Sequence, residues 1–395
     1  MYRKKIFAFL WLVMLFIAEA TSDQTNFMNT FEQVDVDSVD VTDKTNTSFK
    51  TVCYYPVSNK FNKSATDPIP KDLNPMLCSH LIFIPTYIDQ YNRVIPSVPS
   101  DVDLYQTAIP AMRKRNPKLI IMISNGGNIS AVMQSVKNTS EYVNSTVAFL
   151  RKYDIDGIDL DWEFPQPSQY QNYSRVLSEL RKTYEQEAIQ TKKQRLLLSA
   201  AVLTAEPLSE KIYDFDTMKK TLDFVNMMGY DYHGPGGLFT RTDYNCPLPA
   251  MVSSANFWAS KVGKDKLMVG FPFYCHAYKL LTPWMHGYHA FSDGKGECDY
   301  GKYTCACLAI NNKNATSVFD GTHKVPYCYY GNQWVSYENV DSIVLKTKWI
   351  LDNKFAGLMV FEMTSDDISG VCDGKTKFPL MNAILQTIYI YVHRN

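Results

Sequence analysis

Eight short apolar runs recur along the chain, and segments with helical patterns separate them. The runs are rich in Ile, Val, Leu, Met or aromatic residues, as expected for strands buried on both faces of a parallel sheet. Eight strand–helix units predict an α/β fold, the closed (β/α)₈ TIM barrel, whose usual size is about 250 residues. The runs are residues 51–55, 80–84, 118–124, 155–162, 196–203, 224–230, 266–272 and 356–362.

The body of the chain, residues 51–395, is longer than such a barrel requires. The longest gap lies between the seventh and eighth runs, and its residues 277–350 contain four cysteines and a Tyr-rich stretch. We therefore predict a small α+β subdomain at residues 277–350, inserted between strands seven and eight on the catalytic rim of the barrel.

The first 20 residues have the layout of a secretory signal peptide: three basic residues, a twelve-residue apolar run and the site Ala18-Glu19-Ala20. A membrane span needs about 20 apolar residues, so we expect a secreted, extracellular protein. Residues 21–50 are polar without apolar periodicity and indicate a disordered leader. Nine cysteines and seven Asn-x-Ser/Thr sequons fit this route and predict disulfides and a glycoprotein.

The net charge of the chain disfavours some classes of binding partner. The 40 basic and 40 acidic residues cancel, and without the first 20 residues they number 37 and 39. A nearly neutral chain is not expected to bind nucleic acid or an anionic membrane. The seven histidines contain no His-Glu-x-x-His motif, so we do not expect a metal site. We also expect no other cofactor. The protein is expected to be a monomer.

The fourth run carries four acidic residues within eight positions, Asp156 to Glu163. Because side chains alternate along a strand, Asp159, Asp161 and Glu163 share one face, while Asp156 has the opposite parity and is expected to be structural. If that face is the barrel interior, Glu163 emerges at the carboxyl end, where barrel enzymes place their chemistry. An acidic edge strand or a calcium loop is disfavoured, because apolar residues alternate with the acids.

Crowded carboxyl groups in a dry barrel raise one another's pKa, so that some stay protonated. A carboxylic acid that keeps its proton near neutral pH is what a leaving alkoxide needs. The acidic run therefore predicts general acid catalysis.

The sequence here resembles the family 18 glycoside hydrolases, the chitinases and their relatives, over about residues 51–386. Their Asp-x-x-Asp-x-Asp-x-Glu signature is complete in residues 156–163. Residues 124–127 match the family's Ser-x-Gly-Gly, residues 228–231 its Met-x-Tyr-Asp, and residues 266–274 a strand-seven segment that ends Pro-x-Tyr. The resemblance also implies a disulfide between Cys53 and Cys78.

The resemblance implies substrate-assisted retaining hydrolysis of N-acetylglucosaminides, an exception to the usual two-carboxylate scheme. Glu163 would protonate the glycosidic oxygen, and the substrate's own acetamide would attack the anomeric carbon. Asp161 would orient the acetamide and share a proton with Asp159. Tyr230 would donate a hydrogen bond to the acetamide oxygen, Asp231 would bind sugar or hold Glu163, and Met228 would line the pocket. Ser124, Gly126 and Gly127 would let the backbone turn tightly beside the acidic strand.

The departures from the family pattern fall in the substrate groove. Asn128 and Phe361 stand where the family usually has tryptophans, and His276 replaces an arginine two residues after Tyr274. We expect these four residues to contact substrate.

Three interpretations stay open at this point. The protein hydrolyses β-1,4-linked N-acetylglucosamine in chitin or chito-oligosaccharides, or acts on another N-acetylglucosaminide such as an N-glycan core, or is a glycan-binding lectin with vestigial activity. Pairing of Cys372 with either Cys305 or Cys307 also stays open.

Overall fold

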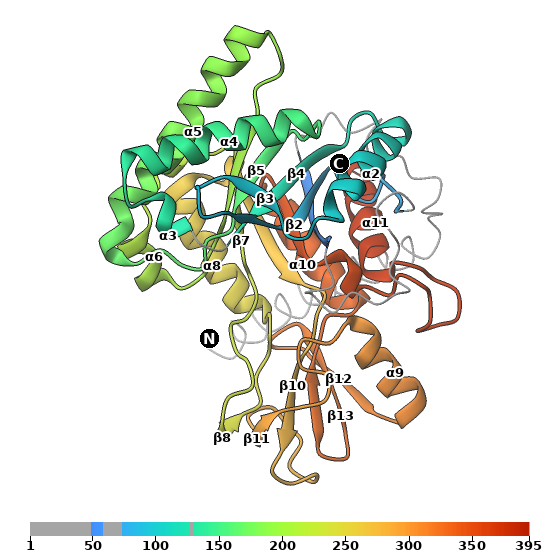
Figure 1. Cartoon of the computed structure of the whole chain (residues 1–395). Coiled ribbons are helices and arrows are strands. Elements are labelled where there is room, and N and C mark those ends of the chain that lie inside the picture. Colours follow the sequence, from blue (N-terminus) through green and yellow to red (C-terminus); the bar gives the residue numbers. More distant parts are fainter. Residues whose placement is uncertain (1–48, 58–72, 127–128, 395) are drawn as a thin grey trace, which may run out of the picture.

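Eight parallel strands close into a barrel in the computed structural model, which describes residues 49–57, 73–126 and 129–394 (Figure 1). Around the barrel the order is β1-β2-β4-β5-β6-β7-β9-β15, and β1 pairs with both β2 and β15. The predicted (β/α)₈ barrel is confirmed. The strands are β1 (Lys50–Pro56), β2 (His80–Ile88), β4 (Ile120–Asn125), β5 (Gly157–Leu160), β6 (Leu197–Val202), β7 (Phe224–Met227), β9 (Leu267–Pro272) and β15 (Gly357–Phe361).

Helices surround the barrel because each buries one apolar stripe. In α5 (Tyr170–Thr191), for example, Tyr173, Leu177, Leu180 and Tyr184 lie three or four residues apart, and all are buried. The short β3 (Val94–Pro96) extends β2 as an antiparallel partner. The other helices are α2 (Asp101–Arg115), α3 (Ile129–Val132), α4 (Val136–Lys152), α6 (Glu206–Ile212), α7 (Phe215–Thr221), α8 (Leu248–Val262), α10 (Val340–Asp352) and α11 (Pro379–Arg394).

A second, antiparallel sheet of six strands forms a lobe at one end of the barrel (Figure 1). The bounds of this lobe differ from the predicted range, residues 277–350. The strand β8, which precedes β9 in the chain, joins the sheet by pairing with β11, and residues 340–352 form α10, which packs against α11 of the barrel. The lobe contains β8 (Leu238–Arg241), β10 (His276–Leu280), β11 (Phe291–Lys295), α9 (Tyr303–Lys313), β12 (Thr316–Asp320), β13 (Val325–Tyr330) and β14 (Gln333–Ser336).

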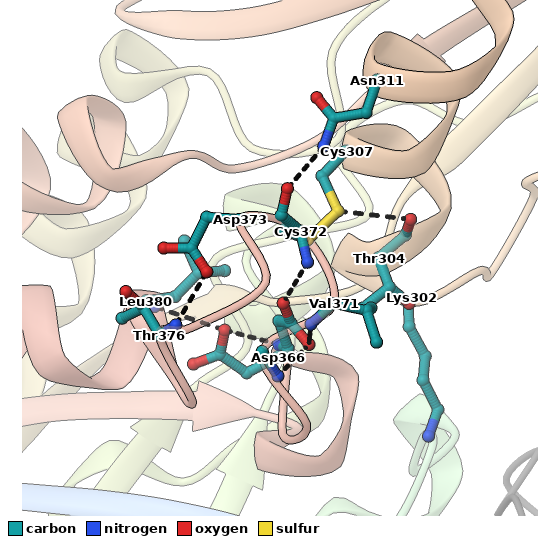
Figure 2. Close-up of a disulfide and its surroundings, with 12 residues drawn as sticks. Lys302, Thr304, Cys307, Asn311, Asp366, Val371, Cys372, Asp373, Thr376 and Leu380 are labelled. Carbon is teal, nitrogen blue, oxygen red and sulfur yellow. Dashed lines mark hydrogen bonds between the residues drawn. A yellow bond between two sulfur atoms is a disulfide. The ribbon is translucent and has the colours of Figure 1, made fainter.

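Three disulfides lie within the described residues. Cys53–Cys78 joins β1 to the segment before β2, and Cys298–Cys305 lies within the lobe. Cys307–Cys372 ties α9 to the loop between β15 and α11, which answers the open question about Cys372 (Figure 2). Of the helices that the structure describes, none combines the length and the apolar character needed to cross a membrane.

Candidate active site

The acidic segment delivers its carboxyl groups to three different places. Asp159 lies inside the barrel, fully buried, whereas Asp161 and Glu163 follow β5 and line a pocket at its carboxyl end. Asp156 lies at the opposite end of the strand. There it accepts hydrogen bonds from the Ile121 amide at 2.7 Å and from Arg113 at 2.9 Å, so it fastens β5 to its neighbours.

Four side chains from four other strands donate hydrogen bonds to Asp159. Strand register places Ser124 and Ser199 directly beside it, since Ser124 pairs with Asp159 across β4–β5 and Asp159 pairs with Ser199 across β5–β6. Burial raises the pKa of Asp159, and the hydrogen bonds only partly oppose this. The donors are Ser199 at 2.6 Å, Tyr54 at 2.7 Å, Asn226 at 3.0 Å and Ser124 at 3.3 Å.

Asp161 and Glu163 are the two carboxyl groups of the acidic segment that line the pocket. Burial raises the pKa of Asp161 well above its usual value, and the negative charges of Glu163 and Asp159 add to the effect. Among the described residues nothing hydrogen-bonds to Asp161 Oδ1, although that atom is buried. Glu163 is more open to solvent, yet crowding by protein atoms still raises its pKa, and the charge of Asp231 contributes. Both shifts favour the protonated form of these carboxyl groups.

Aromatic rings line the same pocket as Asp161 and Glu163. The Tyr230 ring stacks on Phe361 with centroids 5.7 Å apart, and Tyr274 meets Tyr230 edge-on at 6.0 Å. Burial raises the pKa of Tyr230 well above its usual value, so its hydroxyl stays a hydrogen-bond donor. Met228 also lines the pocket, whose volume is about 420 Å³.

Asp231 lies at the rim of the pocket, and His276 lies behind it. His276 is only 2% exposed, and it does not line the pocket. Its Nε2 lies 2.7 Å from Asp231 Oδ1, and its Nδ1 lies 2.9 Å from Asp299 Oδ1. The expectation that His276 contacts substrate is thereby corrected, because both ring nitrogens already face protein carboxylates.

Gly126 allows the chain after β4 to pass close to the acidic segment. A Cβ at this position would lie 3.1 Å from the Asp161 carbonyl oxygen, closer than most Cβ contacts, so the acidic segment would have to shift slightly. Of the other residues predicted here, Gly127 and Asn128 fall outside the described residues.

Comparison with known proteins assigns the family. The model of the family described as "Glycosyl hydrolases family 18" matches residues 50–366. The chain belongs to this family. The family 18 assignment agrees with the barrel and with the acidic segment at the end of its fourth strand.

The similar family 18 proteins include active and inactive members. Human chitinase-3-like protein 2 is 27% identical, covering 86% of this chain and 93% of that protein; mouse chitotriosidase-1 is 29% identical, covering 86% and 78%. A solved structure of an immunomodulatory active chitinase from Trichuris suis is 28% identical with a TM-score of 0.78, covering 86% of this chain and all of that one. Human YKL-39, described as a pseudo-chitinase with retained chitooligosaccharide binding, is also 28% identical, with a TM-score of 0.80 over 86% and 100% of the two chains.

Sequence reasoning missed several residues of this family 18 site. A polar residue within an apolar strand could have indicated Ser199 and Asn226, but Tyr54 looks like any aromatic core residue. Tyr300 and Lys302 come from the segment before α9, and Glu362 and Ser365 follow β15; all four line the pocket. No motif marks these positions, because only the fold brings them to the barrel's end.

Proposed function

We propose that the protein is a secreted retaining glycoside hydrolase that cleaves β-1,4-linked N-acetylglucosamine in chitin or chito-oligosaccharides by substrate-assisted catalysis. One observation carries the proposal. Asp159, Asp161 and Glu163 run from the barrel interior to a pocket whose aromatic wall includes Tyr230.

Glu163 is the proposed general acid. Its raised pKa favours retention of the proton that the glycosidic oxygen must receive as the bond breaks. Tyr230, also protonated, is suited to donate a hydrogen bond to the acetamide oxygen as that oxygen attacks the anomeric carbon.

Asp161 is proposed to orient the acetamide and to stabilise the charge that develops on its nitrogen. Its Oδ1, to which no described residue hydrogen-bonds, can accept from the acetamide N–H. Asp159 shares a proton with Asp161 during the reaction, and the four donors around Asp159 hold it in position for this role. The substrate supplies the nucleophile, so no second carboxylate needs to attack the sugar.

The substrate grip differs from that of a tryptophan-lined groove. Among the described residues, the side chains that line the pocket include Tyr54, Tyr274, Tyr300 and Phe361 but no tryptophan. This composition supports short, soluble or branched substrates, and an N-glycan core remains within the proposed class of N-acetylglucosaminides.

Glycan binding without turnover is the second candidate. The similarity to human YKL-39, a pseudo-chitinase that retains chitooligosaccharide binding, favours it. The intact acidic residues favour hydrolysis, because loss of chemistry would more naturally replace Glu163.

Secretion is part of the proposal. The three disulfides support passage through an oxidising compartment. The signal peptide on which secretion depends lies outside the described residues.

The discriminating experiment assays protein from a secreting host against soluble chito-oligosaccharides, an N-glycoprotein and cello-oligosaccharides. Cleavage of the first supports a chitinase-type enzyme, and cleavage of only the second supports an enzyme of N-glycan cores. Binding of chito-oligosaccharides without cleavage supports the lectin. Cello-oligosaccharides lack the acetamide, so their hydrolysis at a comparable rate would contradict substrate assistance.

A further inference from the structure

Two side chains from the segment that follows β9, the seventh barrel strand, contact Asp231. The Tyr274 hydroxyl donates to Asp231 Oδ1 at 2.5 Å, and His276 Nε2 lies 2.7 Å from the same oxygen. Asp231 itself has a left-handed backbone with φ of +56°, and the Asn245 side chain accepts from its amide. These contacts fix where its charge lies relative to Glu163.

We propose that His276 is a positioning residue, which orients Asp231 and compensates its negative charge beside Glu163. The inference rests on the proposed hydrolase function. It adds that His276 influences the pH range over which Glu163 keeps its proton. His276 acts through Asp231, because it is buried and does not line the pocket.

The contacts of His276 favour an imidazolium. A neutral imidazole has one N–H donor and one acceptor, so one of its nitrogens would face a carboxylate lone pair to lone pair. Both nitrogens here face carboxylates, Asp231 and Asp299. Burial alone would lower the pKa of His276, but the hydrogen bonds and charges of these two carboxylates outweigh it and raise the pKa.

The remaining groups around His276 also favour its protonated, positively charged form. Lys295 lies 3.0 Å from the second oxygen of Asp299. Burial would raise the pKa of Asp299, but His276 and Lys295 lower it, so Asp299 stays ionised. The rings of Tyr274 and Tyr300 meet the imidazole edge-on, with centroids at 5.7 Å and 4.9 Å. Both phenols have raised pKa values and are neutral neighbours.

A positive charge on His276 affects the pKa of Glu163. The charge of Asp231 raises the pKa of Glu163, and a cation beside Asp231 moderates that effect. Without the cation, Asp231 would repel a second negative charge more strongly. Glu163 would then keep its proton to higher pH, so the alkaline limb of the activity profile would move upward.

The test compares pH profiles of kcat/KM for the full secreted protein and three variants. His276→Gln removes the charge and should move the alkaline limb up by about half a pH unit, less than a direct charge contact gives. His276→Arg restores a permanent cation and should return the limb toward wild type. His289→Gln is the matched control, since His289 is half exposed and does not line the pocket. An alkaline limb that stays in place in His276→Gln would overturn the proposal.

Two further measurements keep the inference testable if substitutions at His276 prevent folding or if the wild type does not hydrolyse glycans. Asp299→Asn removes the other carboxylate that contacts His276. It should raise the pKa of Glu163, as His276→Gln does, but by a smaller amount. ¹⁵N NMR of the wild type should show both His276 nitrogens protonated at pH 7, and ¹³C NMR should follow the Glu163 titration without turnover. Absence of turnover would refute the hydrolase alone, whereas a neutral His276 at pH 7 would refute the inference.

Discussion

Glu163 carries the proton on which the proposed reaction depends. Glu163→Gln keeps the size of the side chain but cannot donate that proton, so we expect turnover to fall by about 10²–10⁴-fold. Chito-oligosaccharide binding and the melting temperature should stay near wild type, which separates lost chemistry from lost fold. A variant that retains more than about a tenth of wild-type turnover would remove Glu163 from the role.

Asp161 links the chemistry to stability. Its pKa is raised in the folded protein by burial and by neighbouring carboxylates, whereas in the unfolded chain it lies near its ordinary value of about 4. Below that pH both states hold the proton and no penalty arises; as pH rises, the unfolded state releases it more readily, so folding stability falls. Asp161→Asn removes the penalty and also the activity.

The measurement for Asp161→Asn is denaturant unfolding at pH 4 and pH 7. The free energy of unfolding should exceed that of wild type by on the order of 1 kcal/mol at pH 7, the common size of a single-substitution effect. The difference should shrink toward zero near pH 4. Equal differences at the two pH values would show that the ionised carboxylate is not the cause.

Alternation along one strand predicted that Asp156 and Asp159 point to opposite faces, but β5 ends at Leu160, so Asp161 and Glu163 lie beyond the strand. Alternation could not predict the partners of these acids, because the four donors to Asp159 come from four other strands, and Asn226 is 67 residues away in the chain. The prediction for His276 failed for a related reason. Its second partner, Asp299, lies 23 residues further on in the lobe, where no motif marks it.

At the scale of elements, the eight barrel strands could be predicted because each is a buried apolar run. The second sheet was harder. Its strand β8 has four residues, and most of their side chains are exposed. Such a strand lacks the apolar pattern, and its partner β11 begins 50 residues later, so pairing across that distance has no local signal.

The disulfide Cys307–Cys372 joins α9 to the loop between β15 and α11, and residues close to both segments line the pocket. Tyr300 and Lys302 precede α9, whereas Glu362 and Ser365 follow β15, and all line the pocket. Cys307→Ser with Cys372→Ser should lower the free energy of unfolding by about 4 kcal/mol, given the long loop it closes. The KM for chito-oligosaccharides should rise, because the two segments that carry these lining residues are no longer tied together.

The matched control is Cys298→Ser with Cys305→Ser, which opens a disulfide of sequence separation 7 instead of 65. The shorter loop predicts a loss of about 2 kcal/mol. Chemical denaturation of both double variants compares the two losses. An equal or larger loss in the control would contradict the loop-closure explanation.

The molecule as a whole should bind insoluble chitin weakly. Extracting a chain from a crystal needs grip at many subsites, and each missing indole is taken to be worth about 1 kcal/mol by analogy with aromatic pairs. Several such losses compound to roughly 10²–10³-fold in affinity. Depletion of wild-type protein on chitin beads at high salt would contradict this expectation.

Phe361→Trp should partly restore that grip, because Phe361 lines the pocket and stacks on Tyr230. We expect chito-oligosaccharide affinity to rise by roughly fivefold, the equivalent of about 1 kcal/mol. Phe319→Trp is the control, since Phe319 is exposed on β12 and does not line the pocket. Calorimetric titration compares the two variants, and equal gains would show that the added indole acts nonspecifically.

The most direct test of the whole account is ¹H NMR of a soluble chito-oligosaccharide during the first minutes of digestion by the wild type, with Glu163→Gln alongside. Attack by the acetamide followed by water retains the anomeric configuration, so new reducing ends should appear first as the β-anomer and only later mutarotate. Glu163→Gln should give no product in that time. New ends that appear first as the α-anomer, or a wild type that forms no more product than Glu163→Gln, would contradict a retaining, substrate-assisted hydrolase.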